Sequence, residues 1–125
     1  MDISKQIEYW RTGAEEDIDT AKILLDKNKI KEGLFFCHLS IEKILKANFV
    51  KLNKEFAPKS HNLFYLLSKT DVVLEERSEE FLGILMKYQL EGRYPDYVMD
   101  KPSKEKVSEY FKITKELLNW LMNKL

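Results

Sequence analysis

Apolar residues recur in steps of three and four along most of the chain, which is the pattern of amphipathic helices. In the first such stretch the apolar positions are Ile3, Ile7, Trp10, Ala14, Ile18, Ala21 and Leu25. Charged residues fill most of the positions between them, and Asn28 marks the end of the pattern. The stretch therefore predicts a long helix of roughly 24 residues with one buried face.

A second helix is predicted from about Ile30 to Lys54. Its expected inner stripe consists of Leu34, His38, Ile41, Leu45, Asn48 and Leu52. At about 100° per residue, four lysines fall on the opposite side within an arc of about 140°. These are Lys43, Lys46, Lys51 and Lys54. We expect them to form a solvated face, and as a second possibility a face that attracts phosphate.

Three further helices complete the pattern. We expect Ser60 to cap a short third helix that buries Leu63, Leu66 and Leu67. Asp71 and Ser78 are alternative caps for a fourth, which buries Phe81, Leu82, Leu85 and Tyr88. Gly92 and Pro95 then interrupt the pattern. The last helix begins at Pro102 or Ser103 and turns Val107, Phe111, Thr114, Leu118, Leu121 and Leu125 inward.

These elements predict an all-α protein, an up-and-down bundle of four to five helices in which residues 1–125 form a single domain. A composition with 34% charged residues, four glycines and three prolines agrees with this fold class. The heptad-like spacing of the first and last helices permits a contact between subunits, so we expect a homodimer.

The 21 basic and 21 acidic residues cancel, so no global field draws the protein to nucleic acid or membrane. Locally the charge is uneven. Residues 42–69 hold six lysines against two glutamates, and residues 71–91 hold six acidic groups against two basic ones. A self-complementary dimer or an acidic partner could use this polarity, although solvated helix faces explain it more simply.

Cys37 is the only cysteine, which excludes an internal disulfide and a multi-cysteine zinc site. Its neighbours Phe35, Phe36 and Leu39 favour a small buried thiol. No stretch approaches the ~20 apolar residues that span a bilayer, and no apolar run follows Met1. We therefore expect a soluble, cytoplasmic protein that makes no membrane contact.

Few classes of chemistry fit the remaining residues. The two histidines, His38 and His61, belong to neither an HxxxH nor an HExxH pair, so we expect no metal. A satisfied position near Glu42 is the simplest role for His38, and a local structural role for His61. Neither a Gly-rich phosphate loop nor a Ser-centred nucleophile elbow is present, and we expect no cofactor.

The segment "GRYPDY", residues 92–97, contains parts that suit phosphate or nucleotide binding. The Arg93 guanidinium can pair with phosphate oxygens in two places. Tyr94 and Tyr97 offer ring faces on which a base could stack. Pro95 biases Tyr94 toward an extended backbone, and Asp96 could cap the turn or orient the arginine. The alternative is that the tyrosines only pack the end of the bundle while the arginine pairs with Asp96 or a nearby glutamate.

Four segments together resemble a HEPN domain, in the expected order and over nearly the whole chain. "YWRTGAEEDIDTAKILL" resembles the first helix of the family and "GLFFCHLSIEKILKAN" the second. "KSHNLFYLL" resembles the short third helix, and "GRYPDY" an arginine-tyrosine-proline variant near the fourth. Each motif alone is weak, but four in register favour the assignment.

The resemblance implies a helical bundle that usually dimerises. Many members of the family are metal-independent endoribonucleases of toxin–antitoxin, CRISPR and RNA-processing systems. Others bind nucleotides or act with a separately encoded minimal nucleotidyltransferase. The ribonuclease members carry an Arg-x4–6-His motif, in which the arginine grips phosphate and the histidine assists proton transfer during attack by the 2′-hydroxyl.

In this chain Arg93 matches that arginine, but the histidine would fall at position 98, 99 or 100. Val98, Met99 and Asp100 stand there. None of them can do what imidazole does near neutral pH. His38 could substitute as the acid or base, although nothing in the sequence places it beside Arg93.

The sequence therefore favours a HEPN dimer that lacks standard ribonuclease activity and binds a nucleotide or an RNA phosphate, together with a partner nucleotidyltransferase. The expected ligand-binding residues are Arg93, Tyr94, Asp96, Tyr97 and His38; no catalytic residue is assigned. One alternative is a toxin-type endoribonuclease with His38 or Tyr97 as proton donor. The other is a purely structural module for protein interaction.

Overall fold

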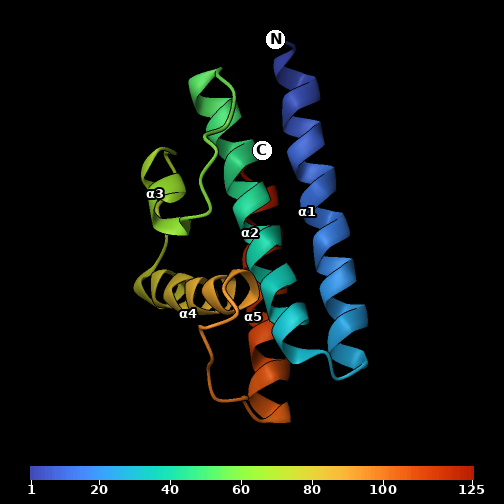
Figure 1. The fold of residues 1–125 in the computed structure, drawn as a ribbon. Helices are drawn as coiled ribbons and strands as arrows, with labels where there is room; N and C mark the ends of the chain where they lie inside the picture. The colour runs from blue at the N-terminus through green and yellow to red at the C-terminus, as the bar shows by residue number, and fades with distance from the viewer.

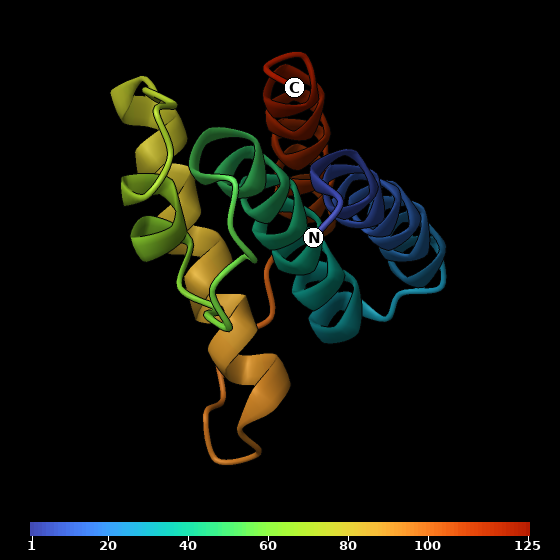
Figure 2. The same cartoon turned by 90° about the horizontal axis from the view of Figure 1, so that it is seen from above.

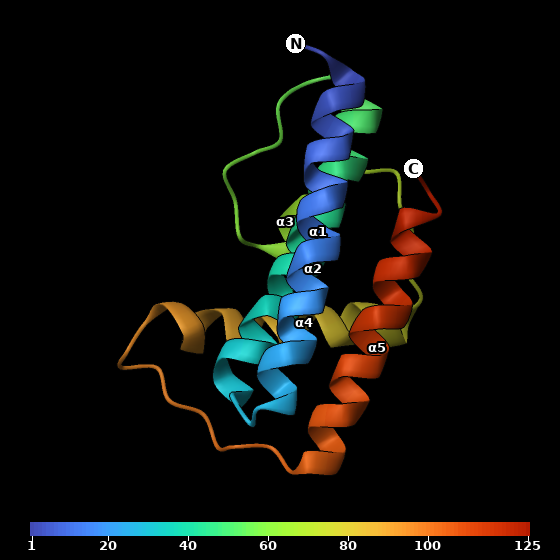
Figure 3. The same ribbon diagram turned by 90° about the vertical axis from the view of Figure 1, so that its right-hand side faces the viewer.

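The computed structural model describes residues 1–125 and contains five helices and no strand. They are α1 (Ile3–Asp26), α2 (Ile30–Asn53), α3 (Leu63–Ser68), α4 (Glu76–Arg93) and α5 (Lys104–Met122). α1, α2 and α5 run side by side, while α4 lies across them and α3 packs beside α2 and α4 (Figures 1 and 3). The all-helical bundle expected from the sequence is confirmed.

Polar side chains fix the start of three helices. Asp2 accepts a hydrogen bond from the backbone N–H of Lys5 at the start of α1, and Ser103 accepts one from Lys106 at the start of α5. α3 is capped by Asn62, which accepts from two backbone N–H groups, and not by Ser60 as predicted. The prediction failed because both residues are good caps and only the path of the chain decides which one lies at the first turn.

The start of α4 also differs from the prediction. Its N-cap is Glu75, which makes no side-chain capping bond, so neither Asp71 nor Ser78 serves. Glu76 and Glu79 lie in the first turn, where negative charge favours the N-terminus of a helix. Charge complementarity and packing thus take the place of a cap.

α2 is the centre of the bundle, since it packs against each of the other four helices. Figure 2 shows it between α1 and α5 on one side and α4 on the other. Every residue from Leu34 to Val50 is buried or half-buried. α1 covers the side of α2 on which the four lysines lie. The prediction that all four are solvated is therefore wrong for two of them.

Lys46 is buried and Lys43 is half-buried against α1, whereas Lys51 and Lys54 are exposed as expected. At the far end of the predicted inner stripe, Leu52 is exposed. The helix ends at Asn53, and its C-cap Lys54 has a positive φ of 56°, the left-handed conformation that commonly closes a helix.

The core otherwise matches the apolar pattern. Ala14, Ile18 and Ala21 of α1 meet the buried stripe of α2, and α5 contributes Leu118 and Leu121. Cys37 is fully buried, as predicted, and burial raises the pKa of its thiol to about 12. None of the helices is long and apolar enough to cross a membrane.

Candidate anion-binding site at the end of α4

The last turn of α4 lies in close contact with α2, and Gly92 makes this approach possible. A Cβ added at Gly92 would stand 2.4 Å from Phe35 Cδ2 and 2.8 Å from its Cγ. Real carbon atoms do not approach so closely, so a larger residue would push α4 and α2 apart. Glycine therefore sets the position of the residue that follows it.

Arg93 ends α4, and its guanidinium carbon lies 5.1 Å from the centre of the Phe35 ring. This is a cation–π contact from the side of α2. Arg93 makes no ion pair with a carboxylate, and its buried Nε has no hydrogen-bond partner. The pairing with Asp96 or a glutamate considered from the sequence is therefore not formed. A buried donor without a partner is costly. The terminal nitrogens of the guanidinium make no hydrogen bond either and are not among the buried atoms, so an anion can approach them.

Residues Tyr94 to Tyr97 form a tight turn directly after the arginine. The Tyr97 N–H donates to the Tyr94 carbonyl over 3.0 Å, with Pro95 at the second position. Tyr94 has an extended backbone (φ −118°, ψ 114°), as its place before proline predicts. Both tyrosine rings and Asp96 are exposed. The turn thus places two exposed tyrosine rings and the Asp96 carboxylate next in sequence to the Arg93 guanidinium.

A histidine of the ribonuclease motif would stand at position 98, 99 or 100. None of the residues at these positions is a histidine. Val98 and Asp100 are exposed, while Met99 is half-buried. The Met99 backbone N–H donates to Glu91 over 2.8 Å, which ties the segment back to α4. This stretch serves to connect α4 to α5.

His38 lies away from the surface, although the sequence places it among the candidate ligand contacts. It is fully buried, and its Nε2 donates to the His61 carbonyl over 3.0 Å, since a carbonyl can only accept. Burial lowers the pKa of His38 to about 4, while the nearby Glu42 carboxylate opposes the change. The positive charge of Arg93 lowers it further, so the two residues are within electrostatic reach of each other.

One turn after His38 on α2, Glu42 is the centre of a buried polar cluster. One carboxylate oxygen accepts from Lys46 Nζ over 3.1 Å, and the other from His61 Nδ1 over 3.1 Å. The exposed fractions of the Glu42 and Lys46 side chains are only 5% and 7%. Lys46 also lies 5.0 Å from the centre of the Trp10 ring. A second pair, Lys43–Asp17 at 2.8 Å, joins α2 to α1 nearby.

For His61 the sequence predicted no more than a local structural role, and the structure gives it a wider one. It belongs to the connection between α2 and α3, yet both its carbonyl and its ring are bonded to α2. Its side chain is 48% exposed. The spacing of 19 residues from Glu42 carries no helical signal, so only the fold brings the two together.

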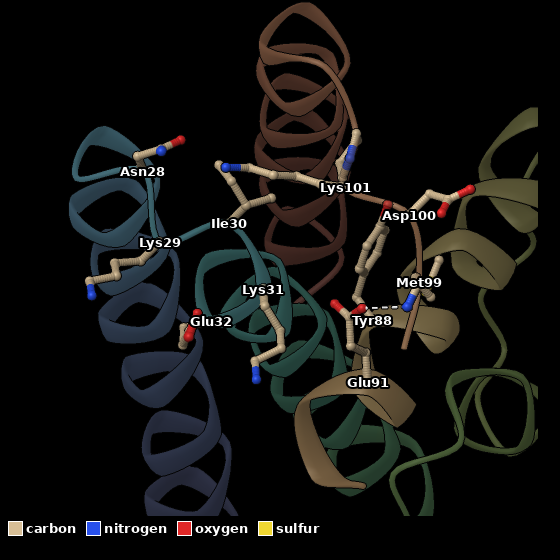
Figure 4. Close-up of a pocket in the computed structure, with 11 residues that line it drawn as sticks. Asn28, Lys29, Ile30, Lys31, Glu32, Tyr88, Glu91, Met99, Asp100 and Lys101 are labelled. Carbon is tan, nitrogen blue, oxygen red and sulfur yellow. Dashed lines mark hydrogen bonds between the residues drawn. The ribbon is translucent and has the colours of Figure 1, made fainter. Parts of the chain in front are cut away.

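A shallow pocket of about 310 Å³ opens beside the connection from α4 to α5 (Figure 4). Its charged lining is balanced: Lys29, Lys31 and Lys101 face Glu32, Glu91 and Asp100. Tyr88 forms part of the wall, and burial raises the pKa of its hydroxyl. The pocket contains no excess of positive charge, and residues 92–97 do not line it.

The comparisons with known proteins agree on the fold. A sequence model of the HEPN domain family matches residues 7–125. The crystal structure of TT1696 from Thermus thermophilus matches with a TM-score of 0.81 and 21% identity, covering 96% of this chain and 98% of that chain. ST0689, an archaeal HEPN homologue, matches with a TM-score of 0.72 and 19% identity, covering 94% of this chain and 96% of that chain. No curated protein matches the sequence significantly.

Proposed function

Because this chain belongs to the HEPN domain family, we propose that it is a HEPN protein that binds a nucleotide or an RNA phosphate through the end of α4. It lacks the standard ribonuclease activity, and it acts as a homodimer beside a partner nucleotidyltransferase. Residues 1–125 work as a single helical domain in this proposal.

The observation that carries the proposal is the state of Arg93. The guanidinium is held against the Phe35 ring, it has no acidic partner, and its buried Nε lacks an acceptor. Such a group is prepared for an oxyanion, because the cost of ordering the side chain is met before the ligand arrives. The adjacent Tyr94 and Tyr97 rings are exposed and suit stacking of a base.

Three of the other candidate contacts support this proposal and one does not. Tyr94, Asp96 and Tyr97 lie on the same short turn as the arginine. His38 is enclosed beneath the surface, so it acts on a ligand only through the residues around it. The direct contacts of the proposal are therefore the arginine and its turn.

The same arrangement supports the proposal that the protein lacks standard cleavage. No histidine follows Arg93 within the expected spacing, and the buried His38 stays neutral down to a pH of about 4, the value of its pKa. An imidazole with so low a pKa that is shielded from solvent cannot shuttle a proton to a substrate at neutral pH.

The homodimer is supported by a groove between α4 and α5 with a volume of about 720 Å³. Apolar side chains from both helices line it, among them Phe81, Ile84, Ile113 and Trp120. Trp120 is 40% exposed, and partly exposed aromatic residues are common in protein interfaces. Light scattering of the wild type and of Trp120→Glu tests this part: loss of a dimer in the variant supports it, and a monomeric wild type contradicts it.

The binding proposal is tested by calorimetry with mononucleotides and short single-stranded RNA. We expect the wild type to bind and Arg93→Ala to bind at least about tenfold more weakly, since a charged hydrogen bond is lost. Arg11→Ala is the matched control, because Arg11 is an exposed arginine on α1, outside both the candidate site and the α4–α5 groove. Equal affinities for the wild type and Arg93→Ala, or no binding by either, would reject the proposal.

A further inference from the structure

His61 is fixed at two points, although it lies on a connecting segment. Its carbonyl accepts from His38 Nε2 over 3.0 Å, and its ring Nδ1 meets Glu42 Oε1 at 3.1 Å. Glu42 also accepts from the Lys46 ammonium, as a carboxylate does. The Nδ1 of His61 therefore carries a hydrogen and donates it. The imidazole is held in one orientation by groups on α2.

The other ring nitrogen is left free by this arrangement. Nε2 of His61 makes no hydrogen bond within the protein, and the side chain that carries it is 48% exposed. A carboxylate on one imidazole nitrogen orients the ring and fixes its tautomer, so the second nitrogen presents a lone pair that can accept a hydrogen bond. The buried Glu42 thus supports a polar contact point at the surface.

His61 and Arg93 lie along the same face of α2. On α2, Phe35 contacts Arg93 and Glu42 is hydrogen-bonded to His61. Phe35 comes seven residues before Glu42 in the chain. Seven residues are about two turns, so the two positions share a face and are separated by roughly 10 Å along the axis. Figure 2 shows the α2–α3 connection between α2 and α4, the helix that ends in Arg93. Both residues also act on the same buried imidazole, His38.

We propose that His61 is a second ligand-contacting residue and that the ligand is single-stranded RNA longer than one nucleotide. Arg93 holds one phosphate, and His61 Nε2 accepts a hydrogen bond from a ribose 2′-hydroxyl further along the strand. A single phosphate group is too small to touch both positions. This inference rests on the proposed function, and it replaces the mononucleotide by an oligonucleotide as the preferred ligand.

The test compares ligands of increasing length against two variants. The His61→Asn variant keeps an N–H donor for Glu42 but loses the Nε2 contact, so it preserves the cluster on α2. We expect the wild type to bind an RNA tetranucleotide more tightly than a mononucleotide. We expect His61→Asn to weaken tetranucleotide binding about tenfold and to leave mononucleotide binding unchanged. Arg93→Ala should weaken both.

A second readout separates contact from structural support. The ¹⁵N resonance of His61 Nε2 should shift when the tetranucleotide is added and stay in place with the mononucleotide. The inference fails if His61→Asn binds the tetranucleotide like the wild type, or if length does not increase affinity. In either case the Arg93 proposal stands as long as Arg93→Ala is impaired. If the wild type binds neither ligand, both proposals fail together.

Discussion

Two charged regions lie against the same helix, α2, and they differ in how their charges are satisfied. In the cluster around Glu42 the carboxylate is buried and bonded to both Lys46 and His61. At the Phe35 end, the Arg93 guanidinium has an aromatic ring beneath it and no carboxylate beside it. A charge with all its partners inside the protein stabilises the fold, whereas a charge without them is available to a ligand. The comparison therefore separates residues that hold the fold from a residue that we propose binds a ligand.

The largest effect on stability should come from Glu42→Ala. The substitution leaves the buried Lys46 ammonium without its carboxylate and frees the His61 ring. Removing one partner of a buried ion pair costs roughly 3–5 kcal/mol of unfolding free energy, measured by urea denaturation. Asp26→Ala is the matched control, since its pair with Lys22 has the same spacing but is exposed and should contribute little. If Glu42→Ala lost as little unfolding free energy as Asp26→Ala, the buried cluster would not stabilise the fold more than an exposed pair does.

The buried His38 should make stability depend on pH. In the unfolded chain its pKa is near 6.5, and in the folded protein burial lowers it to about 4. As the pH falls from 6.5 to 4, the unfolded state takes up a proton that the folded state refuses, so stability decreases. The shift corresponds to a loss on the order of 3 kcal/mol.

Other groups around His38 modify this slope. Glu42 and the hydrogen bond to the His61 carbonyl oppose the lowered pKa of His38, while the charges of Arg93 and His61 add to the lowering. The raised pKa of the buried Asp17 gives stability the opposite dependence on pH. Urea denaturation at several pH values should therefore show a shallower slope for His38→Gln, which cannot titrate. An unchanged slope in that variant would show that other groups cause the dependence.

Gly92→Ala should have an intermediate effect, at the contact of α4 with Phe35 of α2. The added methyl group would overlap the Phe35 ring, so α4 must shift, at a cost of about 1–3 kcal/mol. The same shift should move the guanidinium off the ring and weaken RNA binding. Gly83→Ala is the control on the same helix, because its Cβ would meet only one atom, at 3.8 Å. Equal thermal unfolding of the two variants would contradict the close approach of α4 to α2.

Arg93→Ala should change stability least of all. It removes one cation–π contact, worth about 0.5–1 kcal/mol, and also a buried donor that has no partner. Thermal unfolding should therefore stay close to the wild type while RNA affinity falls. A strongly destabilised variant would place the arginine with the structural residues and end the contrast between the two regions.

The helices and most of the core could be predicted from the sequence, because the repeat of apolar residues is a local property. The stripe Ala14, Ile18 and Ala21 is buried as expected, and the interruption after Gly92 ends α4 where Pro95 requires it. The candidate site was predicted only in part. Arg93 and its turn are adjacent in sequence, so their motif is visible there, whereas the pairing of Glu42 with His61 depends on a connection that folds back onto α2.

The sequence by itself determined which residues can be helical and which side of each helix is apolar, since both follow from spacing along one chain. It did not determine how many faces of a helix are covered. Lys46 lies on the polar side of α2 and is nevertheless buried, because α1 packs there and supplies Trp10. Tertiary structure also decided that Arg93 rests on Phe35 instead of a carboxylate. Burial and pairing depend on which elements meet, and periodicity within one element carries no information about its neighbours.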